Sequence, residues 1–380
     1  MAVSEPLVAH LLPFPGVGGT EIATLRLAQA AREEGFASIA FHLPGAGQTR
    51  DLFAAAGFPT DVYPEHYLSV RRFGTWWRNT RQLAARLRER GVGLVHCSDL
   101  LAGSLAAVSG RMAGLPVVCH VRNRHDVLPL CDRLPLLAVE RFVFVSQATW
   151  RQFGLRIGPA RGTVLYDGIE PHPLDATEAA QARSRVLKEF GLPPGSFLIG
   201  MVARVSPQKD YRTLVEAAAE VVAERPESRF LVVGEYSSVP AYRRHYEEIQ
   251  GWLEERKLRS HFTFTDFRND VPQLVAAFDL FVLCTNWEGF PLVILEAMAQ
   301  GKGVLATAVD GIPEIVVEGG TGLLHAHGDA RGLARQILQL MNDEPLRRKL
   351  ADAGRTLVAT RFSRERFRRS VAELYHQFLG

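Results

Sequence analysis

The chain has 380 residues, more than one hydrophobic core usually supports, so two domains are expected. With 47% hydrophobic and 22% charged residues it has the composition of a folded globular protein, and a net charge of +3 argues against nucleic acid as a main partner. Its apolar runs are shorter than the roughly 20 residues that a membrane span requires. Its four cysteines form no C-x-x-C pair that would indicate a zinc site. Because Met1 to Glu5 lack the features of a secretory signal, we expect a cytoplasmic location.

The first half of the chain alternates short apolar segments with amphipathic stretches, which predicts a parallel sheet flanked by helices. A strand over 7–12 is followed by a predicted helix over 20–34, which ends where Gly35 stands. The further strands predicted in this half are Ser38–Leu43, Gly93–Cys97, Pro116–Val121 and Arg141–Val145.

Residues 71–90 carry seven arginines interleaved with aromatic and aliphatic residues. We interpret the segment as a surface helix that packs Trp77, Leu83 and Leu87 inward and leaves its arginines in solvent. The alternative is a basic amphipathic surface that contacts anionic lipid, which would place the protein at the inner face of the membrane.

The same alternation starts again near residue 196 and predicts a second α/β domain over 196–362. We assign residues 1–170 to the first domain and the proline-containing stretch 171–195, with a helix-like segment over 178–190, to a linker. Residues 363–380 have apolar positions at helical spacing and are predicted to pack back on the first domain. The strands predicted in the second domain are Phe197–Val202, Arg229–Val233, Phe262–Phe264, Leu280–Leu283 and Val304–Ala306, with helices after Lys209, Pro240, Val271 and Pro291.

The segment Asn286–Ala299, which follows the last-but-one of these strands, carries the strongest local pattern. Pro291 suits the first turn of a helix, and a helix start binds anions such as a diphosphate through its free amides. The amides predicted to do so are those of Gly289, Phe290, Leu292 and Val293. Glu288 in the loop can accept hydrogen bonds from sugar hydroxyls. Glu296, two turns into the helix, can reach a ribose, although a lone glutamate on a helix is usually just solvated.

A second pattern, Ala203–Asp210, lies between a strand and a helix and holds two cations, Arg204 and Lys209. Arginine can clamp two oxygens and lysine supplies a compact charge, so the pair suits a diphosphate whose charge grows as it leaves. Taken alone, the two residues also fit the description of solvated loop cations.

A third pattern is the glycine-rich stretch Pro13–Glu21, again between an apolar strand and a helix. Gly18 and Gly19 let a backbone approach a ligand closely, although ordinary turn chemistry explains them equally well. The spacing is not G-x-G-x-x-G, which weakens a dehydrogenase interpretation. His120 and His96 each stand near the end of a predicted strand, where a histidine is more often structural than catalytic.

These motifs and their order resemble those of the large family of retaining, metal-independent bacterial glycosyltransferases, the group 1 glycosyltransferases with the GT-B fold. The resemblance covers nearly the whole chain and also includes the Asp167-Gly168-Ile169 turn and Gly311–Val316. It implies two Rossmann-like domains whose parallel sheets face a central cleft.

The resemblance also implies roles for the residues. Glu288 would face the transferred sugar, Glu296 would hold the ribose, and Arg204 and Lys209 would bind the diphosphate. His120 would contact the donor sugar near the reacting centre, and the loop with Gly18 and Gly19 would close over phosphate and acceptor.

The chain departs from the family pattern at several positions. Members commonly carry glycine shortly after the strand that ends at Phe264, where this chain has Asp266 followed by Phe267. Phe267 is assigned to the nucleotide site, and the identity of the base stays open. Asp167 replaces the usual asparagine of the interdomain turn. No departure removes a proposed charge or amide ligand.

The function implied is transfer of a sugar, with retention, from a UDP- or GDP-sugar to a hydroxyl acceptor in glycan, glycolipid or small-molecule glycoside synthesis. Neither a cofactor nor a metal is expected. Acceptor specificity is expected in the loops 45–50, 63–75 and 122–136. One alternative is a nucleotide-sugar epimerase, which would need acid and base groups beside a sugar carbon. Another is a non-catalytic sugar-nucleotide-binding protein of the same fold.

Overall fold

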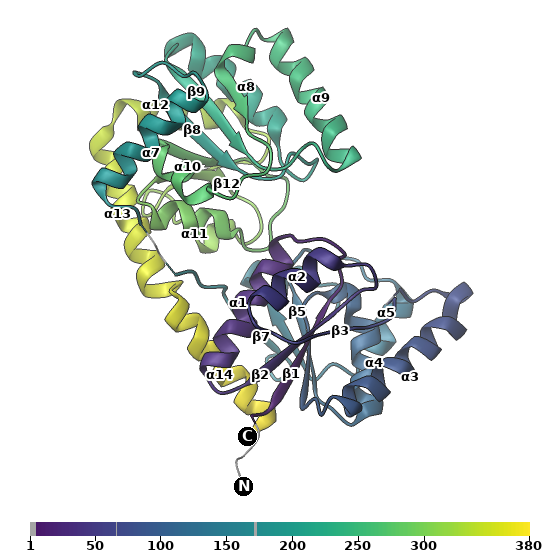
Figure 1. The fold of residues 1–380 in the computed structure, drawn as a ribbon. Helices are drawn as coiled ribbons and strands as arrows, with labels where there is room; N and C mark the ends of the chain where they lie inside the picture. The colour runs from purple at the N-terminus through teal and green to yellow at the C-terminus, as the bar shows by residue number, and fades with distance from the viewer. Residues whose placement is uncertain (1–4, 66, 171–172) are drawn as a thin grey trace. The chain divides into compact units, whose positions relative to one another are not determined.

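The computed structural model describes residues 5–65, 67–170 and 173–380, and the chain forms two compact units. The first unit comprises Met1–Gly168 with Arg364–Gly380, and the second comprises Ile169–Ser363. Each unit is built on its own parallel sheet, which confirms the predicted pair of α/β halves (Figure 1). Of the segment 171–195, which was assigned to a linker, residues 171–172 lie outside the described part. The rest belongs to the second unit, where helix α7 (Ala176–Glu189) packs on α10 (Val271–Ala277).

The first sheet has seven strands in the order β3-β2-β1-β4-β5-β6-β7, all paired in parallel. Side chains of its central strands are almost entirely buried, as expected for a parallel sheet covered on both faces. The strands are β1 (Leu7–Leu12), β2 (Ala37–His42), β3 (Thr60–Val62), β4 (Leu94–Cys97), β5 (Val117–Val121), β6 (Arg141–Phe144) and β7 (Gly162–Val164).

Helices cover both faces of this sheet (Figure 1). On one face, α1 (Gly19–Glu33) packs on the C-terminal helix α14 (Arg364–Leu379), and both pack on Val8, Leu94 and Val118 of the sheet. The other face is covered by α3 (Phe73–Glu89), α4 (Gly103–Ala113) and α5 (Leu130–Leu136). The short helices α2 (Gly47–Ala55) and α6 (Gln147–Arg151) complete the unit, together with single turns of 3₁₀-helix at Val70–Arg72 and Leu100–Ala102.

The arginine-rich segment 71–90 forms α3, but its buried face differs from the predicted one. Leu83 and Leu87 are buried as predicted, whereas Trp77 is 42% exposed and Trp76 takes the inward position, with 4% exposure. Trp76, Thr80, Leu83 and Leu87 recur at three- and four-residue steps, so they form one stripe along the helix. Trp77 is one residue out of phase with that stripe, which is why its inward placement was wrong.

The second sheet has six parallel strands in the order β10-β9-β8-β11-β12-β13. They are β8 (Phe197–Val202), β9 (Ser228–Val233), β10 (Phe262–Phe264), β11 (Leu280–Leu283), β12 (Gly303–Thr307) and β13 (Leu323–His325). Besides α7 and α10, the unit contains α8 (Tyr211–Glu224), α9 (Pro240–Glu255), α11 (Leu292–Ala299), α12 (Ala330–Asn342) and α13 (Glu344–Arg361), with 3₁₀ turns at Arg259–His261 and Ile312–Glu314. Helix α8 packs on α12, and α11 packs on α13.

The strand order of each sheet reverses direction at one point. In the first sheet β1 lies between β2 and β4, and in the second sheet β8 lies between β9 and β11. The chain therefore adds strands on one side of β1 or β8 first and then continues on the other side. In open α/β sheets the loops that leave the carboxyl ends of the two strands at such a point diverge, and ligands bind between them. The relevant loops are 13–18 and 98–99 in the first unit, and 203–210 and 284–291 in the second.

Candidate functional site

The two loops at the switch point of the second sheet are joined by an ion pair. Lys209, at the end of the loop after β8, donates from Nζ to Oε1 of Glu288, in the loop after β11. The two side chains are 10% and 13% exposed, so the pair is largely removed from solvent. A cation and a carboxylate are therefore held next to one another at the edge of the sheet where a ligand is expected to bind.

Several hydrogen bonds fix the position of Lys209. Asp210 caps α8 by accepting from the amide of Thr213 at 3.1 Å, and its own amide donates to the carbonyl of Cys284 at 3.1 Å. The carbonyl of Gln208 accepts from the amide of Asn286 at 2.9 Å. These backbone hydrogen bonds join the loop after β8 to the loop after β11, so they hold the two residues of the ion pair next to one another.

Glu288 is held from a third direction, by the loop after β12. The carboxylate of Asp310 accepts from the amide of Glu288 at 2.9 Å, and the amide of Gly311 lies 3.4 Å from the Glu288 carbonyl oxygen. Asp310 has a φ of +44°, the left-handed conformation that aspartate tolerates better than most residues. Asp310 had no predicted role, although an Asp-Gly dipeptide is a known turn signal.

Helix α11 begins directly after this loop. In the part of the chain that the structure describes, the amides of Gly289, Leu292 and Val293 donate no hydrogen bond, so they remain available to an anion. Phe290 turns into the protein, where its ring meets that of Phe362 edge-on at 5.4 Å. Glu296 lies half-buried on the second turn of the helix.

Arg204 lies at the start of the loop after β8 and is exposed. Its guanidinium donates to the hydroxyl of Tyr242 on α9 at 3.1 Å. The backbone beneath it is closely packed, since the buried Tyr211 hydroxyl donates to the Ala203 carbonyl at 3.2 Å and a Cβ at Gly234 would lie 2.0 Å from the same oxygen. The Arg204 side chain thus projects from a closely packed backbone, and Tyr242 contacts its guanidinium.

At the edge of the second sheet, the turn after β10 places Asp266 in the left-handed backbone conformation that favours glycine. Asp266 has a φ of +62°, and its carboxylate accepts from the amides of Tyr236 at 3.0 Å and Phe267 at 2.9 Å. Burial raises the pKa of Asp266, but hydrogen bonds from Ser237 and from these amides outweigh it and lower the pKa overall. Asp266 therefore adopts the conformation usually left to glycine, and its side chain stabilises the turn through these hydrogen bonds. The next residue, Phe267, is 69% exposed.

In the first unit, the glycine-rich loop precedes α1. The amide of Gly18 donates to Oε2 of Glu21 at 2.9 Å, and Thr49 on α2 donates to the Gly16 carbonyl at 3.2 Å. Burial raises the pKa of Glu21 above its ordinary value. A Cβ at Gly19 would meet no atom within 4 Å, and its φ is not positive, so nothing local in the described structure requires glycine there.

His120 lies near the end of β5 and is fully buried. Neither ring nitrogen has a hydrogen-bond partner in the described part of the chain. Burial lowers the pKa of His120 well below its usual range, and Arg122 adds to the effect, so the ring is neutral. Arg122 in turn pairs with Asp167 at 3.0 Å, and both side chains are 6% exposed. The aspartate at position 167 thus forms an ion pair with Arg122 that an asparagine could not form.

Comparisons with known proteins place this geometry in a family. The model described as "Glycosyl transferases group 1" matches residues 183–357, and "Glycosyltransferase Family 4" matches residues 17–172. The 2-deoxystreptamine glucosyltransferase of Streptomyces kanamyceticus is 30% identical over 285 residues, which cover 69% of this chain and 70% of that protein. The chain belongs to the group 1 glycosyltransferase family.

Other relatives agree with this assignment. The N-acetyl-alpha-D-glucosaminyl L-malate synthase of Bacillus anthracis is 30% identical over 52% of this chain, and the match spans about half, 49%, of that protein. The solved structure of Anabaena Alr3699/HepE in complex with UDP-glucose has a TM-score of 0.84 at 22% identity, covering 98% of this chain and 99% of the other. That likeness concerns the fold, which is GT-B as predicted.

For this group 1 glycosyltransferase, the structure brings together only some of the predicted site residues. Lys209, Glu288 and the start of α11 lie around one switch point, with Arg204 at the root of the same loop. Phe267 follows β10, at the far edge of that sheet. Gly18, Gly19 and His120 belong to the first unit. Asp310, Tyr242 and Arg122 had not been assigned roles, because their partners are distant in sequence and become apparent only in the fold.

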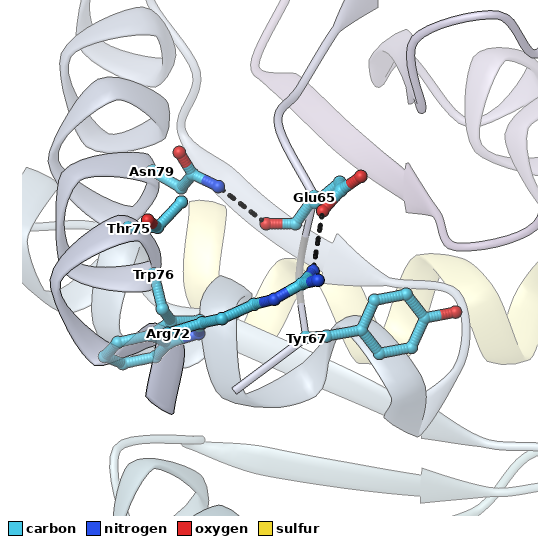
Figure 2. Close-up of a pocket in the computed structure, with 6 residues that line it drawn as sticks. All are labelled: Glu65, Tyr67, Arg72, Thr75, Trp76 and Asn79. Carbon is cyan, nitrogen blue, oxygen red and sulfur yellow. Dashed lines mark hydrogen bonds and ion pairs between the residues drawn. The ribbon is translucent and has the colours of Figure 1, made fainter. Parts of the chain in front are cut away.

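A pocket of about 210 Å³ lies between the start of α3 and the loop before it (Figure 2). Its lining residues are Glu65, Tyr67, Arg72, Thr75, Trp76 and Asn79. Arg72 pairs with the Glu65 carboxylate at 3.9 Å, and the Asn79 side chain donates to the Glu65 carbonyl at 3.1 Å. The volume is below the range typical of drug-sized ligands. The pocket contains none of the predicted donor residues, and four of its six lining residues belong to the segment 63–75.

Within the described ranges, no helix combines the length and apolar character that spanning a bilayer requires.

Proposed function

We propose that this glycosyltransferase moves a sugar from a nucleoside-diphosphate sugar, with UDP or GDP as the carrier, to a hydroxyl group of an acceptor. The observation that carries the proposal is the buried Lys209–Glu288 pair beside the free amides of α11. The lysine and the amides supply positive charge for a diphosphate, and the carboxylate accepts hydrogen bonds from a sugar. The crystallised complex of Anabaena Alr3699/HepE with UDP-glucose, a protein of the same fold, lends support.

In the proposed reaction the bond between the anomeric carbon and the diphosphate oxygen breaks as the acceptor oxygen attacks from the same face. The proton of the acceptor hydroxyl passes to the departing diphosphate. Arg204, Lys209 and the α11 amides stabilise the charge that develops on the leaving group, and this electrostatic contribution is the main source of rate acceleration. Glu288 orients the sugar through its hydroxyls.

Incubation of the purified chain with a panel of UDP- and GDP-sugars, with and without hydroxyl acceptors, tests the proposal. Mass spectrometry should detect released nucleoside diphosphate together with a glycosylated acceptor, or slow donor hydrolysis when no acceptor is present. A donor recovered in epimerised form would favour the epimerase alternative. Saturable nucleotide binding without turnover of any donor would indicate a non-catalytic binding protein.

Stereochemistry and metal dependence form a separate prediction. Because Arg204, Lys209 and the helix amides provide the positive charge, transfer should persist after exhaustive treatment with EDTA, and proton NMR of the first product should show the anomeric configuration of the donor. Loss of activity on chelation that magnesium or manganese restores would contradict metal independence. An inverted product would contradict the same-face mechanism.

We further propose that residues 71–81, which span the end of the 3₁₀ turn and the start of α3, contact an anionic membrane. In the described part of the chain Arg71, Arg78 and Arg81 make no ion pair, and the neighbouring Phe73 and Trp77 are 55% and 42% exposed. Exposed aromatic rings beside unpaired arginines are typical of surfaces that bind anionic lipid. The arginines near the end of the helix are engaged otherwise, since Arg86 and Arg90 both bond to Asp61.

Flotation with vesicles of phosphatidylglycerol and phosphatidylcholine measures this contact. The wild-type chain should float with the anionic vesicles and not with phosphatidylcholine alone, and the R78E/R81E variant should lose roughly 30-fold or more in binding, at about 1 kcal/mol per arginine. The matched control is R331E, which reverses an exposed charge on α12 in the other unit. Equal flotation of the wild type and R78E/R81E would contradict the proposal.

A further inference from the structure

Helix α5 of the first unit presents an apolar face to solvent. Four aliphatic residues in and beside it are each at least 62% exposed: Val127, Leu130, Leu134 and Leu137. We name them the aliphatic stripe. They follow one another at steps of three or four residues, and Leu137 caps the helix with helical backbone angles, so the leucines lie on one side of it. Single exposed aliphatic residues are common on protein surfaces, whereas a contiguous group marks an interaction site.

The opposite side of α5 holds the helix on the unit. Leu136 is buried, and a Cβ at Gly103 on α4 would lie 3.0 Å from its side chain. The carboxylate of Asp132 accepts from the hydroxyl of Ser104 on α4 at 2.9 Å. The guanidinium of Arg161 donates to three backbone carbonyls at the end of the helix. The stripe is therefore exposed because of the way in which α5 is anchored.

The free charge beside the stripe is positive. Near α5, the carboxylate of Asp126 pairs with Arg124 at 2.9 Å, and that of Glu140 accepts from a backbone amide of β5 at 2.7 Å. The third carboxylate, Asp132, is the one turned toward α4. Arg133 is exposed and donates to a backbone carbonyl at 3.1 Å, and among the described residues it makes no ion pair. An anionic partner is therefore favoured at this surface.

These features suit a lipid bilayer better than a protein. A standard protein interface takes about 20–30 residues from each partner, and aromatic side chains are enriched in it. The stripe offers four residues, all of them aliphatic. A bilayer needs no complementary shape, since aliphatic side chains enter the acyl-chain region while a neighbouring arginine stays with the phosphates.

The stripe belongs to the same group of helices as the arginine-rich segment 71–81. Helix α4 packs on both α3 and α5, and the three helices cover one face of the first sheet (Figure 1). One unit thus carries exposed arginines on one helix and exposed aliphatic residues on another.

We propose that the aliphatic stripe inserts into the acyl-chain region of an anionic bilayer and that Arg133 binds lipid phosphates beside it. The inference does not depend on sugar transfer. It adds an apolar contact to the electrostatic one proposed for residues 71–81: the arginines bring the chain to an anionic surface, and the stripe holds it there. Phosphatidylcholine alone should bind the chain weakly, because four aliphatic side chains bury little apolar area without that attraction.

A fluorophore on Cys131 reports the insertion directly. Cys131 is exposed and follows Leu130, whereas Cys97, Cys119 and Cys284 are buried, so a thiol-reactive nitrobenzoxadiazole should label this position. When vesicles of phosphatidylglycerol and phosphatidylcholine are added, its emission should shift to shorter wavelength. Nitroxides in the acyl chains should quench it more strongly than nitroxides on the headgroups. Unchanged emission with vesicles that bind the chain would overturn the insertion.

The variant L130S/L134S removes half of the stripe. Its partition into the same vesicles should fall roughly tenfold or more, because the leucines leave water when the chain binds lipid. This loss should be equal at low and at raised salt, whereas the loss in R78E/R81E should shrink, since salt screens charges. V317S is the matched control, because Val317 is 49% exposed in the second unit, and it should bind as the wild type does. Both serine variants should keep the wild-type melting temperature, since the replaced side chains are exposed.

Equal partition of L130S/L134S and the wild type would count against the stripe as a lipid contact. A wild-type dimer in sedimentation that L130S/L134S abolishes without lipid would also overturn the inference, because a second copy would then cover the stripe. A chain that binds no vesicle would overturn both membrane contacts. Neither readout involves sugar transfer, so a chain that shows the shift in emission but no transferase activity would contradict the proposed function and support the insertion.

Discussion

Replacement of Lys209 by alanine is expected to lower kcat/KM for sugar transfer by about 100-fold or more, because a preorganised charge aimed at a departing diphosphate contributes at that scale. The structure adds a second consequence. Lys209 is largely buried against Glu288, so its removal leaves a carboxylate without its partner, and the free energy of unfolding should fall by about 3 kcal/mol. Steady-state kinetics and urea denaturation measure the two effects.

A double substitution separates these consequences. In K209M/E288Q both charges of the pair are replaced by side chains of similar length, which should restore most of the stability lost in K209A but none of the activity. Recovery of more than a tenth of the wild-type kcat/KM would show that the pair is structural. K302M is the matched control, since Lys302 is a half-buried lysine before β12 that donates to the Ala276 carbonyl. It should lose stability and retain transfer.

The variant R204A is also expected to lower kcat/KM by roughly 100-fold, because a guanidinium can bind two diphosphate oxygens at once. The free energy of unfolding should change by no more than about 0.5 kcal/mol, since Arg204 is exposed and donates to the exposed hydroxyl of Tyr242. Kinetics, thermal denaturation and calorimetric titration with UDP and GDP provide the measurements.

Two further variants define what Arg204 contributes. R204K keeps the charge but loses the planar guanidinium, so its kcat/KM should be about tenfold higher than that of R204A and about tenfold lower than that of the wild type. Y242F removes the hydroxyl that Arg204 contacts and should change kcat/KM by no more than about threefold, because a single exposed hydrogen bond is involved. If R204A retained wild-type kcat/KM and nucleotide affinity, Arg204 would be an ordinary solvated cation of the loop.

The local residue pattern alone predicted most of the strands that make up the two sheets. The strands Leu7–Leu12, Phe197–Val202, Phe262–Phe264 and Leu280–Leu283 have the predicted bounds, and six others agree within one or two residues at each end. Continuous apolar runs identify such strands because a parallel sheet is buried on both faces. The strands that were missed, β3, β7 and β13, have three residues each and lie at sheet edges. β10 is equally short and was predicted, but the segments of β3, β7 and β13 were not recognised from the sequence, and pairing with a neighbouring strand makes them part of a sheet.

The sequence by itself determined the two α/β halves, the family, and the candidacy of Arg204, Lys209 and Glu288. These depend on short-range information: the apolar period, a helix start after a strand, and residue types suited to a diphosphate. The tertiary structure decided which candidates meet. Lys209 and Glu288 are 79 residues apart, and they form a pair because β8 and β11 are neighbours in the sheet. Asp310 supports Glu288, and Tyr375 contacts His96, for the same reason: strand order and helix packing bring together side chains whose separation along the chain carries no local signal.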